Sequence, residues 1–126
     1  MASERRSFPR YPVHFPVTVT LPEDAANTVY PASANSLSRT SVQIECSSEL
    51  IAALLRQQKL PYMAHLEFVL PWQKKHTFNL DASVVTHRRL SQQDYVLVLL
   101  FRHFDPKQEA LLDKLLLAQQ KPIGLE

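Results

Sequence analysis

The feature that most constrains the fold is an alternation of apolar and polar residues that recurs in short segments along the chain. A period of two is typical of β-strands that bury one face, because successive side chains point to opposite sides of a sheet. A weaker segment and one continuously apolar segment complete the set, so we expect a mainly β protein. The expected strands cover residues 13–21, 28–34, 42–46, 64–70, 78–84 and 95–101.

Two further segments have the apolar spacing of helices. Ser47 or Ser48 is a suitable N-cap for a short helix that ends near Gln58. Asp105 followed by Pro106 begins a second helix over about 105–120. This order of elements predicts a six-stranded antiparallel β-barrel with a short internal helix and a C-terminal α-helix over its surface or mouth. The length of 126 residues suits one such domain, over residues 13–126.

Glycine and cysteine counts exclude several classes of site. The only glycine is Gly124, whereas phosphate-binding loops and nucleophile elbows need glycines at several positions. The only cysteine is Cys46, and the five histidines include no H-x-H or H-x-x-x-H pair. We therefore expect no metal site, no cofactor and no enzymatic activity.

The N-terminal residues 1–12 are polar and charged, and we expect them to form a flexible arm. Pro9 and Pro12 favour extended backbone before them, which places Arg6 and Arg10 on one side of the arm, about 13 Å apart. A guanidinium donates paired hydrogen bonds to phosphate or to guanine. With Arg5 beside them, these arginines suit an anionic ligand that carries bases.

A second polar stretch, Ser36–Ser41, lies between two expected strands and is predicted to be a turn. Its small hydroxyl side chains and the neighbouring Asn35 donate and accept hydrogen bonds at short range. A turn of this kind also exposes backbone N–H groups that face an anion.

Together, the arginine pair and the turn resemble the motifs of the PilZ domain family, and the resemblance covers nearly the whole chain. The first motif, R-x-x-x-R, is present as Arg6 to Arg10, and the second, D/N-x-S-x-x-G, corresponds to Ser36–Ser41. PilZ domains are six-stranded barrels that bind the bacterial second messenger cyclic di-GMP. The resemblance implies ligand-binding roles for Arg5, Arg6, Arg10, Ser36, Ser38 and Ser41, with Asn35 and Arg39 as additional candidates.

The second motif departs from the family pattern at two positions. Ser36 stands where the family has Asp or Asn, although Asn35 is adjacent and substitutes for it if the turn shifts by one residue. Ser41 stands where the family has Gly. If that position requires a left-handed backbone, a serine there costs about 1 kcal/mol.

The resemblance implies a cytoplasmic bacterial receptor whose arm changes conformation on binding cyclic di-GMP and signals to a downstream protein in motility or biofilm regulation. A degenerate module of the same fold, which binds proteins or forms a homodimer through Leu111–Leu117 without the nucleotide, is an alternative. An RNA-binding barrel that uses Trp72 and the arm arginines is a third, although a net charge of +2 argues against nucleic acid. The longest apolar run, Tyr95–Phe101, is far shorter than the ~20 residues of a membrane span.

Overall fold

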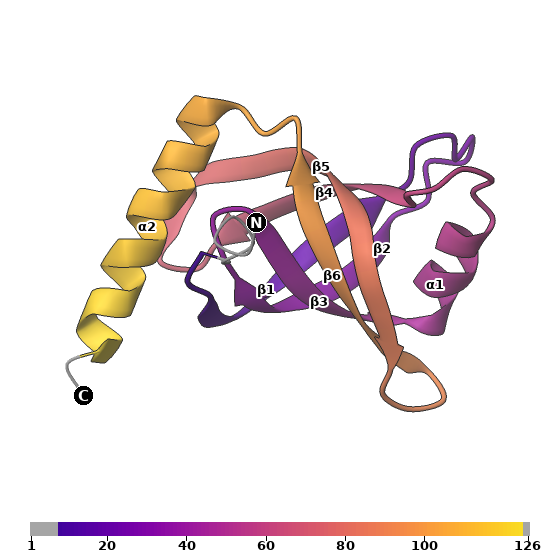
Figure 1. Cartoon of the computed structure of the whole chain (residues 1–126), viewed down its shortest axis with the longest axis horizontal. Helices are drawn as coiled ribbons and strands as arrows, with labels where there is room; N and C mark the ends of the chain where they lie inside the picture. Colours follow the sequence, from indigo (N-terminus) through magenta and orange to yellow (C-terminus); the bar gives the residue numbers. More distant parts are fainter. Residues whose placement is uncertain (1–7, 125–126) are drawn as a thin grey trace, which may run out of the picture.

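A computed structural model describes residues 8–124 of the chain, with side chains up to residue 119. It contains six strands and two helices, and α1 and α2 lie at opposite ends of the molecule (Figure 1). The elements are β1 (Tyr11–Thr20), β2 (Tyr30–Leu37), β3 (Ser41–Ser47), α1 (Ser48–Leu55), β4 (Met63–Leu70), β5 (Gln73–Arg89), β6 (Asp94–Arg102) and α2 (Pro106–Gly124).

The strands form a closed antiparallel barrel in the order β1-β2-β3-β6-β5-β4, in which β4 pairs back onto β1. This confirms the six-stranded antiparallel barrel with a short internal helix and a C-terminal helix. The apolar positions of the alternating segments point inward, and Phe68 stacks between Phe15 and Phe78 with ring centroids 5.3 and 5.4 Å away. Closure gives every strand two neighbours over part of its length.

Helix α2 covers one end of the barrel. Leu112 and Leu116 are fully buried, and the indole Nε1–H of Trp72 donates to the carbonyl of Leu115 at 3.0 Å. Trp72 is therefore a contact between the β4–β5 turn and α2. No helix within residues 8–124 is both long enough and apolar enough to cross a membrane.

Several element boundaries differ from those expected. β1 begins at Tyr11, two residues before the expected start of the domain at 13, because Tyr11 is buried and pairs with Leu37 of β2. The proline-containing first half of β1 pairs with β2 alone, and pairing with β4 begins only at Val17. That arrangement accommodates Pro12 and Pro16, which donate no backbone hydrogen bond.

The internal helix ends at Leu55, earlier than expected, because the side chain of Gln57 forms two hydrogen bonds with the backbone of Met63. Its N-cap is Ser47, whose side chain makes no capping hydrogen bond. The C-terminal helix continues beyond the expected end at 120 as far as Gly124.

The polar turn is also shorter than the predicted Ser36–Ser41. β2 continues to Leu37 and β3 begins at Ser41, so only residues 38–40 connect the two strands. Pairing with the neighbouring strands overrides the turn-like composition of this stretch.

Candidate functional site

The turn between β2 and β3 is built on the side chain of Ser38. Its Oγ accepts the backbone N–H groups of Thr40 at 3.2 Å and of Ser41 at 3.1 Å, while its own N–H donates to the carbonyl of Ser41 at 2.9 Å. Ser38 is only 1% exposed. The hydroxyl that the sequence assigns to ligand binding is therefore occupied within the turn, where it fixes the backbone of the site.

Arg10 lies against this turn, directly before β1. Its Nε–H donates to Oγ of Ser36 at 2.8 Å and an Nη–H donates to the carbonyl of Ser36 at 3.2 Å. Its other terminal nitrogen donates to Oγ of Ser41. Partial burial lowers the pKa of Arg10 from its usual value. The structure thus brings together three of the predicted residues, one from the arm, one near the end of β2 and one at the start of β3.

Arg39, at the tip of the same turn, points to α2 instead. Its Nε lies 3.1 Å from a carboxylate oxygen of Glu109, and Nη1 lies 3.5 Å from a carboxylate oxygen of Asp113. The guanidinium also lies over the ring of Phe8, 4.9 Å from its centroid. Arg39 therefore links the N-terminal segment, the turn and α2.

Asn35 belongs to a polar network on the outer face of the barrel. Its amide nitrogen donates to a carboxylate oxygen of Glu45 at 3.0 Å, and its amide oxygen accepts from Nε2 of Gln43 at 2.9 Å. Neither Gln43 nor Glu45 was singled out from the sequence. The available signal was their position as the polar members of the alternating segment 42–46, next to the motif turn.

Arg5 and Arg6 lie outside the described residues. Ser41 is not among the non-glycine residues with positive φ in the described chain, which are Glu23, Asn27 and His103. It adopts ordinary strand backbone, so the cost expected for a serine in left-handed conformation does not arise.

The remaining candidates have structural surroundings. Burial raises the pKa of the Cys46 thiol to about 11, which makes it a poor nucleophile. His65 lies 3.0 Å from a carboxylate oxygen of Asp81 on the outer face. Among the described residues, no three side chains of metal-ligating type lie together.

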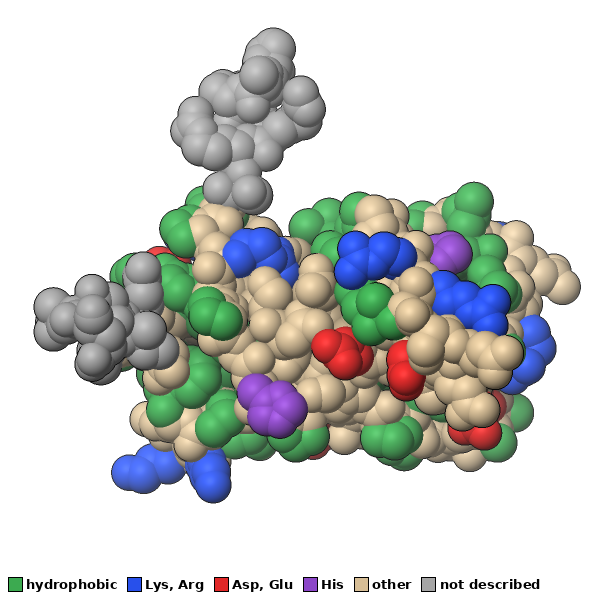
Figure 2. Space-filling model, turned by 90° about the horizontal axis from the view of Figure 1, so that it is seen from below, with side chains coloured by type: hydrophobic (Ala, Val, Ile, Leu, Met, Phe, Trp, Pro, Cys, Tyr) green, Lys and Arg blue, Asp and Glu red, His purple; other side chains and the backbone are tan. Residues whose placement is uncertain are grey.

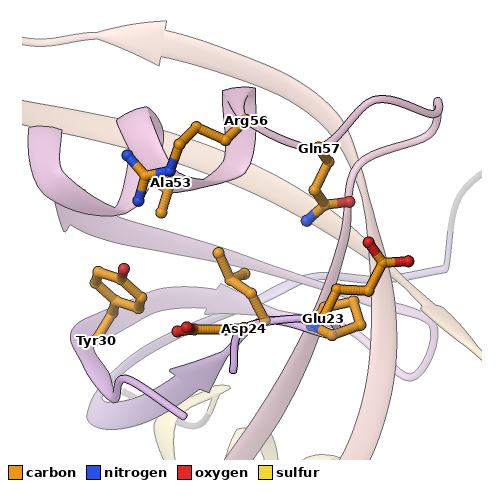
Figure 3. Close-up of a pocket in the computed structure, with 8 residues that line it drawn as sticks. Glu23, Asp24, Tyr30, Ala53, Arg56 and Gln57 are labelled. Carbon is orange, nitrogen blue, oxygen red and sulfur yellow. The ribbon is translucent and has the colours of Figure 1, made fainter. Parts of the chain in front are cut away.

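A cleft with a volume of about 170 Å³ lies away from the Arg10 contact, between α1 and the β1–β2 turn (Figure 3). Asp24 lines it, and hydrogen bonds from the backbone of Thr28 and Ala26, with a smaller contribution from Arg56, lower the pKa of its carboxyl group. None of the predicted site residues lines this cleft.

The surface charge of the barrel is mixed. Figure 2 shows Lys and Arg side chains across one face, with acidic side chains beside them. Among the described residues of that face, apolar and acidic groups interrupt the basic ones. A continuous basic surface, which nucleic-acid-binding domains present, is not formed there.

Comparisons with known proteins identify the fold. No family model matches the sequence, and no curated protein matches it. Among solved structures, the PilZ domain of YcgR from Escherichia coli with c-di-GMP is 14% identical, with a TM-score of 0.63 over 94% of each chain. The PilZ domain of CeSA from a cellulose-synthesizing bacterium is 16% identical, with a TM-score of 0.58 over 89% of this chain and 98% of that one.

The inhibitor of motility (MotI/DgrA) of Bacillus subtilis is also similar. It is 15% identical, with a TM-score of 0.69 over 92% of this chain, and this chain spans 51% of that longer protein. At such low identity the similarity shows the fold alone.

Proposed function

Because this chain has the PilZ-type barrel and holds Arg10 against the β2–β3 turn, we propose that it is a receptor for cyclic di-GMP. The observation that carries the proposal is the contact of the Arg10 guanidinium with Ser36 and Ser41. It joins the two sequence motifs at one place on the outer surface.

The partners of Arg10 explain how a ligand enters. All three described acceptors are neutral oxygen atoms, which bind a guanidinium less strongly than the anionic oxygens of a phosphate do. A cyclic dinucleotide therefore replaces the two serine hydroxyls as the partner of Arg10. The released hydroxyls then bind the ligand in turn, so that the turn and the arginine both contact it.

The N-terminal arm supplies the response. Arg5 and Arg6 precede Arg10, and we propose that they close over the nucleotide once Arg10 has bound it. Ordering a segment around a ligand changes the surface that a protein presents to a partner. The protein would then act as a cytoplasmic bacterial adaptor for a downstream protein.

The named neighbours support this assignment. One of them is a PilZ domain of YcgR with c-di-GMP, another is an inhibitor of motility, and a third comes from a cellulose-synthesizing bacterium. Regulation of motility or of biofilm material is the process that these neighbours favour for this chain.

Calorimetric titration of the purified protein with cyclic di-GMP tests the proposal. We expect saturable heat, together with shifts of the backbone NMR signals of the arm and of residues 36–41. GTP, which carries guanine and phosphates without the cyclic dinucleotide, is the control ligand and is expected to bind much more weakly. No heat and no NMR shift at high micromolar cyclic di-GMP would reject the proposal.

Two observations favour the second candidate, a protein-interaction module that binds no nucleotide. Arg10 already occupies the hydroxyls of Ser36 and Ser41, and Leu117 on α2 is 52% exposed. Two results together would indicate this module. The nucleotide titration is negative, and a partner protein binds the wild-type protein but not the Leu117→Lys variant.

A further inference from the structure

A directed chain of hydrogen bonds runs beside the Arg10 contact. A carboxylate only accepts hydrogen bonds, so the amide nitrogen of Asn35 must face Glu45, at 3.0 Å. The amide oxygen of Asn35 then faces Gln43, whose Nε2 donates to it at 2.9 Å. The carboxylate therefore fixes the orientation of both amides, and the amides in turn fix the position of the carboxylate.

Strand pairing places this chain next to Arg10. Ser36, the residue that Arg10 contacts twice, is paired with Gln43 across β2 and β3. Glu45 lies two residues after Gln43 on β3, about 7 Å from it along the strand and on the same face of the sheet. A cation and a carboxylate thus lie at the two ends of one short polar strip on the outer wall of the barrel.

The end that carries Glu45 opens onto a surface hollow of about 340 Å³. Ser33, Ser47 and Asp94 also line this hollow, and Glu45 itself is exposed. Only one of its two carboxylate oxygens has a hydrogen-bond partner among the described residues. The second oxygen can accept a hydrogen bond from a group that enters the hollow.

The two ends of the strip differ in the chemistry that they bind. The Arg10 end suits phosphate oxygens, and the Glu45 end suits a group with N–H donors. The pairing edge of guanine presents two adjacent N–H donors, at N1 and N2, which match an acceptor-only carboxylate. The corresponding edge of adenine presents one donor and one acceptor, and its acceptor nitrogen faces a carboxylate unfavourably.

We propose that Glu45, held in place by Asn35, recognises the pairing edge of guanine and makes the site select guanine over adenine in a bound cyclic dinucleotide. This inference rests on the proposed function, because it names the specificity residue of the same site. Asn35 acts as a positioning residue, since it contacts Glu45 and leaves the base to the carboxylate.

Removal of the Glu45 carboxylate changes the affinity for the ligand in opposite directions, depending on whether the carboxylate binds guanine or only lies near the site. A carboxylate that merely lies near the site repels the two phosphates of the ligand, so its removal would tighten binding of any cyclic dinucleotide. A carboxylate that binds guanine instead strengthens binding of cyclic di-GMP, and its removal weakens that ligand alone.

The experiment compares titrations of cyclic di-GMP and cyclic di-AMP into the wild-type protein and the Glu45→Gln variant. We expect the wild type to prefer cyclic di-GMP. Glu45→Gln should weaken cyclic di-GMP by roughly ten-fold or more, the usual discrimination of a paired base contact. It should leave cyclic di-AMP unchanged or slightly tighter. Asn35→Ala should weaken cyclic di-GMP less than Glu45→Gln does.

Glu67→Gln is the matched control. Glu67 is an exposed carboxylate on β4, where it pairs with Thr18 and Asn79, away from β2 and β3. The Glu67→Gln substitution changes the net charge by the same amount as Glu45→Gln, so its effect on affinity measures long-range electrostatics alone. We expect its affinities for both ligands to equal those of the wild type.

The outcomes distinguish this inference from the proposed function. If the wild type binds neither cyclic dinucleotide, the proposed function fails and the inference fails with it. If the wild type binds cyclic di-GMP and Glu45→Gln binds it equally well or more tightly, only the inference is overturned. A wild type that binds both dinucleotides equally also overturns it.

Discussion

Two arginines lie at the turn between β2 and β3, and the groups that they contact differ in charge. Arg10 approaches the turn from the N-terminal side, and all its described partners are neutral oxygens of Ser36 and Ser41. Arg39, at the tip, faces the carboxylates of Glu109 and Asp113. Among the described residues, carboxylates thus compensate the charge of Arg39, whereas none contacts Arg10.

This difference shows why proximity to a motif does not make a residue a ligand contact. An anion that displaces the partners of Arg10 replaces two hydroxyls and one carbonyl, and it gains charge-assisted hydrogen bonds in exchange. An anion that takes Arg39 must displace two carboxylates and leave them without their cation. Under the proposed function, we therefore expect Arg10 to bind the ligand and Arg39 to connect the turn to α2.

The largest expected effect comes from removing each arginine in turn. Arg10→Ala should weaken cyclic di-GMP by about 100-fold, because several charged hydrogen bonds are lost together. Arg39→Ala should change the affinity by no more than a few-fold. Isothermal titration of both variants measures the difference, with Arg88→Ala, on β5 away from the turn, as the control. Equal losses of affinity for Arg10→Ala and Arg39→Ala would contradict the different roles of the two arginines.

A smaller effect is expected from the turn that both arginines share. Ser38→Ala leaves the backbone N–H groups of Thr40 and Ser41 without the Oγ that they bind, at a cost of about 1–3 kcal/mol in the free energy of unfolding. Urea denaturation measures it. Ser47→Ala is the matched control, since that hydroxyl makes no capping hydrogen bond, and it should change stability by less than about 0.5 kcal/mol.

The Ser38→Ala variant also distinguishes a ligand contact from a residue that shapes the turn. Should Ser38→Ala unfold like the wild type and yet lose the ligand, Ser38 would be a direct contact of the nucleotide. A loss of stability, accompanied by a smaller loss of affinity, would instead agree with a residue that shapes the turn for Arg10.

Most of the barrel was predictable because its strands repeat a simple rule. The alternation at Val17 and Val19 and at Ile44 and Cys46 directly reports which side of a strand is buried. The boundaries were harder to predict, because they depend on partners. Ser36 lies in a stretch with the composition of a turn. It is nevertheless part of β2, because it pairs with Gln43 of β3.

The contacts of the site divide in the same way. The family resemblance predicted that the arm closes over a ligand held by the turn. It did not predict the direct contact of Arg10 with Ser36 and Ser41. The link from Arg39 to Glu109 was not predicted either, because it joins residues 70 positions apart and depends on where α2 packs. The pairing of Asn35 with Glu45 was missed for a related reason. A register shift between Ala34 and Ser36 decides what Asn35 faces.

The smallest expected effect is the strength of the Arg39 connection itself. The side chains of Arg39 and Glu109 are 33% and 31% exposed, so water and salt screen their attraction. A double-mutant cycle with Arg39→Ala and Glu109→Ala should give a coupling of about 0.2–1 kcal/mol in urea denaturation, falling towards zero in about 1 M salt. A coupling well above this range, or one that salt leaves unchanged, would mean that α2 holds the turn strongly. Binding at Arg10 would then depend on α2 as well, and the two arginines would form one unit.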